Sequence, residues 1–279
     1  MRDEREKLIQ ALRTLGFGGS GPAEAAEVTE AAEKMLEFEN LVLERNETIN
    51  LTAITDRDEF LTKHLVDSCS CYGWPEIAAA ARIVDIGTGA GFPGVPLALL
   101  YPEKQFVLID SLGKRTDFIT EAAQKLDISN VEALHMRAED AGRDPGLRES
   151  FDLCVTRAVA ALPVLEEYCL PLVKTGGFLY AYKTQNAEGE LADGTLARSL
   201  LGGSRDAESR PIGPRRDMKA RILEGPGPIK GAENGGSAAA KLVGPGDLPF
   251  SRRIFIIKKE RPTPASYPRK AGVPAKIPL

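Results

Sequence analysis

Cysteine, long apolar runs and excess positive charge are all scarce or absent in this chain of 279 residues. Its four cysteines, at positions 69, 71, 154 and 169, form no Cys-x-x-Cys pair and lie at no zinc-ligand spacing from a histidine. Neither a disulfide framework nor a metal site is therefore expected. No run of about 18 apolar residues is present to cross a membrane, and the charged residues after Met1 do not form a signal peptide. These absences favour a cytoplasmic protein that does not enter a membrane.

The formal net charge of −4 conceals a strong asymmetry along the chain. Residues 1–60 carry 14 acidic and 7 basic side chains, whereas residues 251–279 carry 8 basic side chains and 1 acidic side chain. The C-terminal end should therefore attract phosphate groups, and the N-terminal end should repel them. From charge alone, the basic end could equally be a solvated tail without a partner.

A short apolar segment runs into a glycine-rich turn and then a helix at residues 83–94, IVDIGTGAGFPG. Ile83 to Ile86 suit a buried strand, and the glycines at 87, 89 and 91 allow positive φ and close approach of a ligand to the backbone. Pro96 suits the first turn of the helix that follows. This order of elements predicts a ligand-binding turn, and the alternative is a tight turn without a ligand.

The class of ligand follows from the acid beside the turn. Gly89, Gly91 and Gly94 match the dinucleotide pattern, but a dinucleotide fingerprint begins directly after its strand, and here the first glycine comes four residues after Asp85. A carboxylate at Asp85 would repel a pyrophosphate and attract a cation. S-adenosylmethionine, which carries a sulfonium and an ammonium group, fits this charge. Its ribose calls for an acid at the end of the next strand, where Asp110 lies.

Strands alternate with helices from residue 82 onward, which predicts an α/β fold with a mainly parallel sheet covered on both faces. The expected strands are 82–86, 105–109, 131–136, 151–156 and 178–183, and the expected helices are 94–100, 114–126 and 163–172. Ligands of such sheets bind beyond the carboxyl ends of the strands. The positions of interest at that edge are Asp85, Asp110, Ala138-Glu139, Arg157 and Lys183.

The first 80 residues are expected to form a helical extension. Residues 23–45 carry apolar side chains at three- and four-residue spacing, which predicts an amphipathic helix. A second helix should begin at Thr55 or Asp56 as its N-cap. It would contain His64, which is either a packed residue or a base.

The region after residue 185 departs from the alternating pattern. A short helix is expected at Leu191–Leu201, and the glycine- and proline-rich residues 202–247 are expected to form a long flexible loop. A last strand is predicted at Arg253–Ile257. The domain division is then an N-terminal extension over 1–80, one α/β domain over 81–260 and a basic tail over 261–279.

Seven motifs occur in an order that is similar to one protein family. They are Asn50-Leu51-Thr52, Lys63-His64-x-x-Asp67-Ser68, Asp85 to Gly94, Asp110 to Arg115, Ala138-Glu139, Arg157-Ala158 and Tyr267 to Pro274. Over residues 35–185 and 252–279 the chain resembles the bacterial ribosomal RNA small-subunit methyltransferase G family, also called glucose-inhibited division protein B. The resemblance implies a Rossmann-like class I S-adenosylmethionine-dependent methyltransferase fold, with a mostly parallel seven-stranded sheet and an N-terminal helical extension.

The resemblance also implies an activity and a set of site residues. The expected reaction is transfer of a methyl group from S-adenosylmethionine to N7 of one guanosine in 16S ribosomal RNA, on the RNA or the small ribosomal subunit. The cofactor contacts would be Gly87, Phe92, Ala138, Glu139 and Arg157, with Arg157 near the reacting end and with Asp85 and Asp110 added from the residue argument above. The candidates for RNA binding are Lys114, Arg115, Lys183, Arg269, Lys270 and Lys276.

Methylation at N7 agrees with the lack of several catalytic groups that other methyl-transfer reactions require. Guanine N7 presents a lone pair and loses no proton, so direct in-line transfer needs no dedicated general base. No Asn/Asp-Pro-Pro-aromatic tetrapeptide for methylation of an exocyclic amine occurs. Cys154 and Cys169 lie on strand and helix patterns and are expected in the core rather than as nucleophiles.

Other functions stay open at this stage. A small-molecule or protein methyltransferase would share the fold, an NAD-dependent oxidoreductase would share the turn, and a ribosome-binding protein without enzymatic activity would share the basic tail. A monomer is expected, because no pattern indicates an extensive dimer surface. If the tail binds RNA, Lys270→Glu should weaken RNA methylation without weakening cofactor binding.

Overall fold

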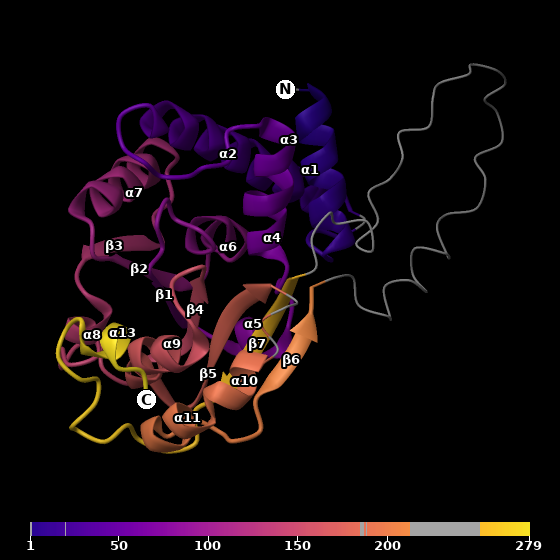
Figure 1. Ribbon diagram of the computed structural model, residues 1–279. Coiled ribbons are helices and arrows are strands. Elements are labelled where there is room, and N and C mark those ends of the chain that lie inside the picture. The colour runs from indigo at the N-terminus through magenta and orange to yellow at the C-terminus, as the bar shows by residue number, and fades with distance from the viewer. Residues whose placement is uncertain (1, 20, 185–186, 188, 213–251) are drawn as a thin grey trace, which may run out of the picture.

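The computed structural model describes residues 2–19, 21–184, 187, 189–212 and 252–279. Its centre is one seven-stranded sheet with the strand order β3-β2-β1-β4-β5-β7-β6 (Figure 1). Strands β1 to β5 run parallel, and β7 runs antiparallel to both of its neighbours. The bounds are β1 Arg82–Ile86, β2 Gln105–Asp110, β3 Val131–His135, β4 Phe151–Arg157, β5 Val173–Thr184, β6 Glu208–Pro211 and β7 Arg252–Lys258. The predicted α/β fold with a mostly parallel seven-stranded sheet is confirmed.

Side chains of the central strands alternate between two hydrophobic clusters, one on each face of the sheet. In β1, Ile83 belongs to one cluster, and Val84 and Ile86 belong to the other. Burial on both faces explains why the strands of this parallel sheet are nearly continuous apolar runs. The first face is covered by helices that include α2 Pro22–Asn46, α6 Gly94–Leu100 and α7 Gly113–Lys125. The second is covered by α8 Ala138–Ala141, α9 Leu162–Cys169 with the 3₁₀ turn Leu170–Leu172, and α11 Thr195–Leu201.

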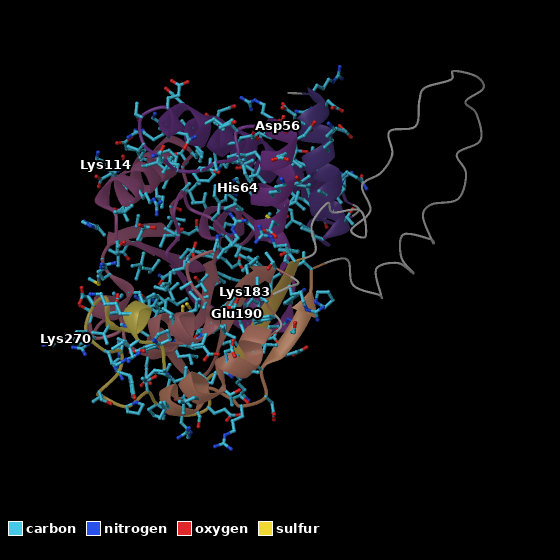
Figure 2. The ribbon with its side chains drawn as sticks, viewed as in Figure 1. Asp56, His64, Lys114, Lys183, Glu190 and Lys270 are labelled. Carbon is cyan, nitrogen blue, oxygen red and sulfur yellow. The ribbon has the colours of Figure 1, made fainter. Side chains whose placement is uncertain are left out.

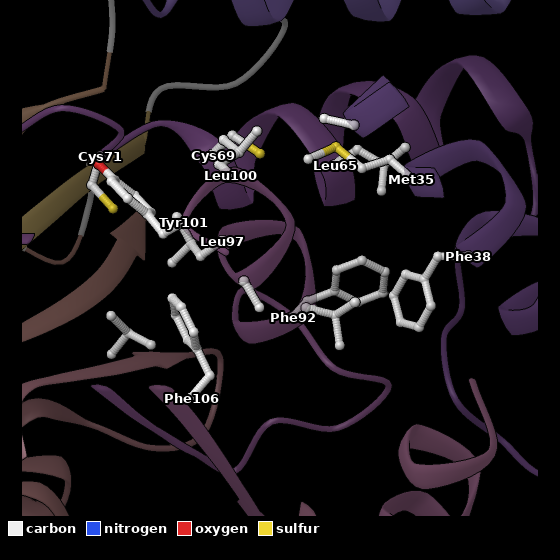
Figure 3. Packing of buried hydrophobic residues seen from close by; sticks show 14 of the residues in the cluster. Met35, Phe38, Leu65, Cys69, Cys71, Phe92, Leu97, Leu100, Tyr101 and Phe106 are labelled. Carbon is white, nitrogen blue, oxygen red and sulfur yellow. The ribbon is translucent and has the colours of Figure 1, made fainter. Parts of the chain in front are cut away.

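The N-terminal extension is helical, as predicted. It consists of α1 Arg2–Thr14 and α2 Pro22–Asn46, followed by the short helices described below and by α5 Pro75–Ala79. Helix α2 buries the predicted apolar stripe, including Met35, Phe38 and Val42. Phe38 packs on Phe92 of the glycine-rich turn (Figure 3), so the extension shares the core of the main domain.

The predicted second helix changes its winding twice. Asp56 is its N-cap, because its carboxylate accepts a hydrogen bond of 2.9 Å from the backbone N–H of Glu59. Helix α3 Arg57–Phe60 continues as the π-helix η1 Leu61–Val66 and ends as α4 Asp67–Cys69. Short π-helical turns often lie at functional sites, and this one contains His64.

Two expectations after residue 185 are wrong in detail. The helix predicted at Leu191–Leu201 is divided into α10 Gly189–Asp193 and α11 Thr195–Leu201. Residues 208–211 of the predicted loop form β6, which pairs with β7 through a contact that sequence periodicity cannot reveal. Residues 213–247 of that loop lie outside the described residues. Strand β5 is also longer than predicted, since it begins at Val173.

The basic C-terminal segment, residues 261–279, packs against the domain. Both terminal nitrogens of Arg148 donate to its backbone, with 2.8 Å to the carbonyl of Tyr267 and 2.7 Å to that of Thr263. The segment ends near the short helix α13 Val273–Lys276, which lies beside α8 and α9 (Figure 1). This placement brings the end of the chain to the carboxyl edge of the parallel strands.

Candidate active site

A cavity of about 350 Å³ lies at the carboxyl ends of β1, β2, β3 and β4. This volume falls within the range of about 300–1,000 Å³ that is usual for small-molecule sites. The edge is the one at which open α/β sheets bind their ligands. The cavity is lined by Ile86, Gly87, Ile109, Asp110, Ser111, Arg115, Met136, Arg137, Ala138, Glu139, Ala158, Val159, Ala160, Tyr168 and Ala275.

Gly87, which follows β1, allows the segment after β4 to pack closely against the glycine-rich turn. It has a φ of +69°, and a Cβ atom at this position would lie 2.4 Å from Cγ2 of Val159. Only glycine avoids both the strain and the collision. Val159 follows Ala158, whose own φ is +57°, so the segment after β4 turns sharply over the glycine-rich turn. Gly87 and Val159 both line the cavity, so this close approach of the two segments forms part of its wall.

Asp85 lies beneath the glycine-rich turn and is not among the residues that line the cavity. One oxygen, Oδ2, accepts 2.7 Å from the Thr88 hydroxyl and 2.9 Å from the Gly94 N–H, which fastens both ends of the turn. Complete burial raises the pKa of Asp85 to about 7, against the lowering effect of these hydrogen bonds and of Arg157. The geometry thus makes Asp85 an internal brace. Its predicted role as a cofactor contact stays a prediction.

Asp110 does line the cavity. Its Oδ2 accepts 3.0 Å from the Gly89 N–H and lies 3.3 Å from Nη1 of Arg115, and its Oδ1 accepts 2.9 Å from the Leu112 N–H. These contacts hold the carboxylate at the end of β2, facing the turn. An ionised carboxylate has acceptor capacity for about four hydrogen bonds, so Asp110 can still receive ligand hydroxyls.

Ala138 and Glu139 begin α8 at the third wall of the cavity. The buried Glu139 carboxylate accepts 2.7 Å from the N–H of Gly272 in the C-terminal segment. Gly272 has a φ of +80°, a conformation that favours glycine. Three residues later, Ala275 reaches the cavity itself. The C-terminal segment is therefore part of the site.

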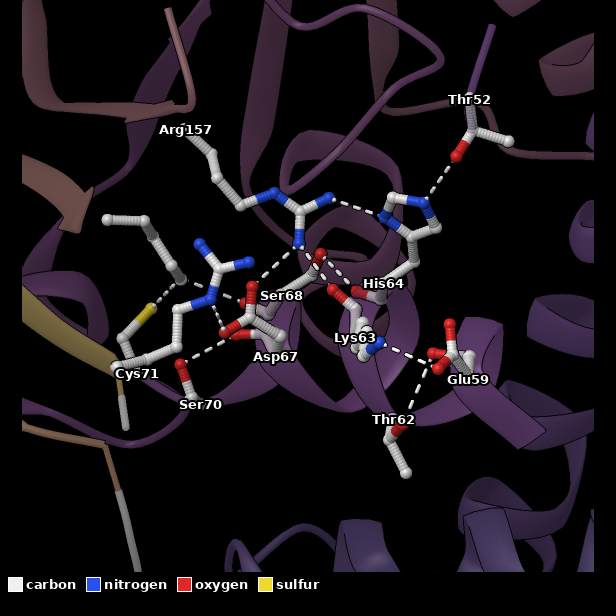
Figure 4. A network of polar contacts seen from close by, with 12 residues as sticks. Thr52, Glu59, Thr62, Lys63, His64, Asp67, Ser68, Ser70, Cys71 and Arg157 are labelled. Atoms are coloured by element: carbon white, nitrogen blue, oxygen red, sulfur yellow. Dashed lines mark hydrogen bonds and ion pairs between the residues drawn. The ribbon is translucent and has the colours of Figure 1, made fainter. Parts of the chain in front are cut away.

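Arg157, at the end of β4, is buried next to the cavity in a polar network (Figure 4). Its Nη1 donates 2.7 Å to Oδ2 of Asp67 and 3.1 Å to the carbonyl of Lys63. Its Nη2 lies 3.1 Å from Nδ1 of His64. The Lys63-His64-x-x-Asp67-Ser68 motif thus surrounds the guanidinium, a link between distant segments that the sequence did not reveal.

Phe92 is buried in an aromatic cluster rather than in the cavity wall. Its ring stacks on His64, with centroids 4.7 Å apart and planes 11° apart, and meets Phe38 and Phe60 edge-on. The guanidinium carbon of Arg157 lies 5.4 Å from the Phe92 ring centre. The structure therefore joins Phe92 to Arg157, and its predicted contact with the cofactor stays a prediction.

The six candidate RNA-binding residues fall into different settings, and Figure 2 labels three of them, Lys114, Lys183 and Lys270. Lys114, Lys270 and Lys276 are exposed. By contrast, Lys183 is buried, and its ammonium donates 2.7 Å to Glu190 and 2.7 Å to the Ala160 carbonyl. Arg269 forms a two-pronged ion pair with Glu167, whose shortest contact is 2.6 Å. Arg115 pairs with Asp110 inside the cavity. For Lys183 and Arg269, an RNA contact is the less favoured role.

Several residues that line the cavity were not predicted from the sequence. Met136 and Arg137 follow β3 and could have been found by the rule that strand ends carry the site. Tyr168 and Ala275 arrive through packing of α9 and α13, for which the sequence carries no local signal. Within the described ranges, no cluster of three or more His, Cys, Asp or Glu is arranged to hold a metal ion. None of the helices in those ranges has the length and hydrophobicity of a transmembrane segment.

The sheet order and the cavity define the class, which is the Rossmann-like class I fold of S-adenosylmethionine-dependent methyltransferases. The sequence profile of the family described as rRNA small subunit methyltransferase G matches residues 31–206. The chain belongs to this family. The predicted enzyme class and cofactor are thereby confirmed, because the family consists of S-adenosylmethionine-dependent methyltransferases.

Two relatives carry the name of this family. The chain is 38% identical to the ribosomal RNA small subunit methyltransferase G of Acetivibrio thermocellus, over 99% of both chains. It is 40% identical to the protein of the same name from Moorella thermoacetica, over 87% of this chain and 88% of the relative. Among solved structures, an O-methyltransferase from Bacillus cereus is 18% identical with a TM-score of 0.48, over 80% of this chain and 91% of that one.

Proposed function

We propose that this protein methylates N7 of one guanosine in 16S ribosomal RNA by direct in-line transfer from S-adenosylmethionine. The observation that carries the proposal is the cavity at four strand ends, in a chain that is 38% identical over its length to a named small-subunit methyltransferase. The bound cofactor supplies an electrophilic methyl group on its sulfonium. The remaining work falls to the residues of this chain.

Those residues bind the cofactor and orient it toward the guanine. Gly87 lines the cavity and has no side chain to keep the cofactor from its backbone, and Asp110 has acceptor capacity for ribose hydroxyls. The start of α8 at Ala138 offers a turn for the adenine. Since N7 loses no proton, orientation alone has to lower the barrier, and holding two reactants in line supplies roughly 7–11 kcal/mol.

RNA would be held by exposed lysines at the mouth of the cavity. Lys114 precedes Arg115, which lines the cavity, and Lys276 follows Ala275, which also lines it. Lys270 lies two residues before Gly272, which is bonded to Glu139. Phosphate contacts of this kind position the RNA and make its binding dependent on salt. Selection of one guanosine would then rest on RNA shape and on extrusion of an unpaired base.

The test is transfer of a labelled methyl group from S-adenosylmethionine to small ribosomal subunits from cells that lack this gene. Subunits from cells that contain the gene serve as the matched control, because their target is already modified. We expect one labelled guanosine, located by N7-specific chain cleavage, in the first sample alone. Equal labelling of both samples, or label at another atom, would refute the proposal.

A further inference from the structure

His64 lies between the glycine-rich turn and the end of β4 and contacts a side chain from each. Its ring stacks on Phe92, and its Nδ1 is 3.1 Å from Nη2 of Arg157 (Figure 4). On its other side, Nε2 is 2.7 Å from the hydroxyl of Thr52. One imidazole therefore links three motifs that are separated in the sequence.

The partners of His64 fix its protonation and tautomer. A guanidinium offers only N–H donors, so Nδ1 must accept and cannot carry a proton. The proton of the neutral ring is then on Nε2, which donates to Thr52. Burial, followed by the charges of Arg157 and Arg252, lowers the pKa of His64 to about 3, in agreement with a neutral ring.

Thr52 is itself held in place. Its backbone N–H donates 3.0 Å to Oδ1 of Asn46, and its hydroxyl oxygen accepts 3.0 Å from the Ile54 N–H. The π-helix η1 contributes as well, because the carbonyl of His64 accepts 2.6 Å from the Ser68 hydroxyl. His64 is thus held in position both by contacts to its ring and by a hydrogen bond to its backbone carbonyl.

This arrangement excludes one of the two roles that the sequence left open. A general base needs a free lone pair on nitrogen, and the only lone pair of the neutral ring points at the Arg157 cation. His64 therefore does not act as a base, which agrees with a reaction at N7 that requires none.

We propose that His64 is a positioning residue, which in its Nε2–H form holds the guanidinium of Arg157 and the ring of Phe92 in the geometry that binds the cofactor. The inference rests on the proposed function, since Arg157 and Phe92 meet the cofactor only if that function is correct. Without His64, Asp67 and the Lys63 carbonyl still hold Nη1 of Arg157, but Nη2 loses its acceptor.

Two variants separate this role from simple packing. In His64→Asn, the amide oxygen takes the place of Nδ1 and can accept from Arg157. In His64→Gln, the amide nitrogen takes the place of Nε2 and can serve only Thr52. Both variants lose the stack on Phe92, so their difference isolates the contact to Arg157.

The measurement is calorimetric affinity for S-adenosylmethionine, together with the thermal midpoint of each protein without cofactor. We expect His64→Asn to bind about tenfold more tightly than His64→Gln, a difference of about 1.4 kcal/mol, because only the asparagine can accept a hydrogen bond from Nη2 of Arg157. The midpoint of His64→Gln should be the lower of the two, because Nη2 of the buried Arg157 then lacks its acceptor, so the affinities are compared at a temperature at which both variants are folded. Equal affinities for S-adenosylmethionine would overturn the inference.

A second pair of variants tests the tautomer. Thr52→Val removes the acceptor of Nε2–H and should weaken cofactor binding, whereas Thr62→Val, whose hydroxyl bonds only backbone carbonyls of Asp58 and Glu59, should not. Equal behaviour of the two would contradict the role of Thr52. If the unaltered protein does not bind S-adenosylmethionine at all, the proposed function fails before His64 is tested.

Discussion

Two groups of cations near the carboxyl edge of the sheet differ in their surroundings. The paired cations, Arg157, Lys183 and Arg269, each lie within 2.7 Å of a carboxylate oxygen. The rim cations, Lys114, Lys270 and Lys276, are exposed. Neutralised charges attract phosphate weakly, whereas exposed ones retain their field. The paired cations should therefore shape the site, and the rim cations should hold RNA.

Arg157→Gln should have the largest effect on folding. It leaves the fully buried Asp67 without its closest partner, and loss of one member of a buried pair costs about 3 kcal/mol or more. Urea unfolding measures this change. The matched rim variant, Lys114→Gln, should change the free energy of unfolding by less than about 0.5 kcal/mol. Similar losses in both variants would remove the distinction between the two groups.

The pH dependence of stability should reveal the neutral His64. Its pKa is about 3 in the folded protein, against an ordinary value of 6.5 that the unfolded chain should show. Its contribution to stability is therefore complete above pH 6.5 and is lost as the pH falls toward 3. The charged groups nearest to the His64 ring are Arg157 and Arg252, and both form ion pairs with Asp67. Between pH 6.5 and 5, the unaltered protein should lose about 2 kcal/mol relative to His64→Asn. The measurement is urea unfolding of both proteins at several pH values. If their free energies of unfolding changed by the same amount across that range, the ring would not be held neutral.

Lys183→Met should have a smaller effect, because Glu190 is partly exposed. We expect a loss of about 1 kcal/mol of stability from the broken pair. RNA binding should keep the same dependence on salt concentration, since Lys183 is already neutralised. Filter binding over a range of salt concentrations measures this slope. A slope that falls by about one would instead place Lys183 on the RNA.

Lys270→Glu should leave stability unchanged and weaken RNA binding a few-fold, by less than about 1 kcal/mol. Its salt slope should fall, and its calorimetric affinity for S-adenosylmethionine should not change. Lys125→Glu, an exposed lysine at the opposite end of α7 from Lys114, is the control and should bind RNA normally. Cofactor affinity that falls in step with activity would contradict the assignment of Lys270 to RNA.

The parts of the fold that could be predicted are those in which local pattern decides the structure. The strand at Arg82–Ile86, its glycine-rich turn and the acid at Asp110 follow from apolar runs, glycine conformations and strand ends, and all three lie as expected. The N-cap at Asp56 is similarly local.

What could not be predicted depends on contacts between distant segments. Strand β6 exists because β7 pairs with it, and Ala275 reaches the cavity because the C-terminal segment is bonded to Glu139. The same holds for Lys183 and Arg269, whose sequence positions suggest RNA but whose carboxylate partners are set by packing. Charge can be counted from a sequence, but its neutralisation requires the fold.

The most direct test of the central claim is a crystal structure of the protein with S-adenosylhomocysteine. The account predicts that this ligand lies in the cavity at the four strand ends, with its ribose at Asp110 and its sulfur on the side of Arg157. A second hollow of about 250 Å³ lies between α2 and α7, lined in part by Glu44, Glu121 and Lys125. Binding there, or anywhere away from Gly87 and Asp110, would contradict the account.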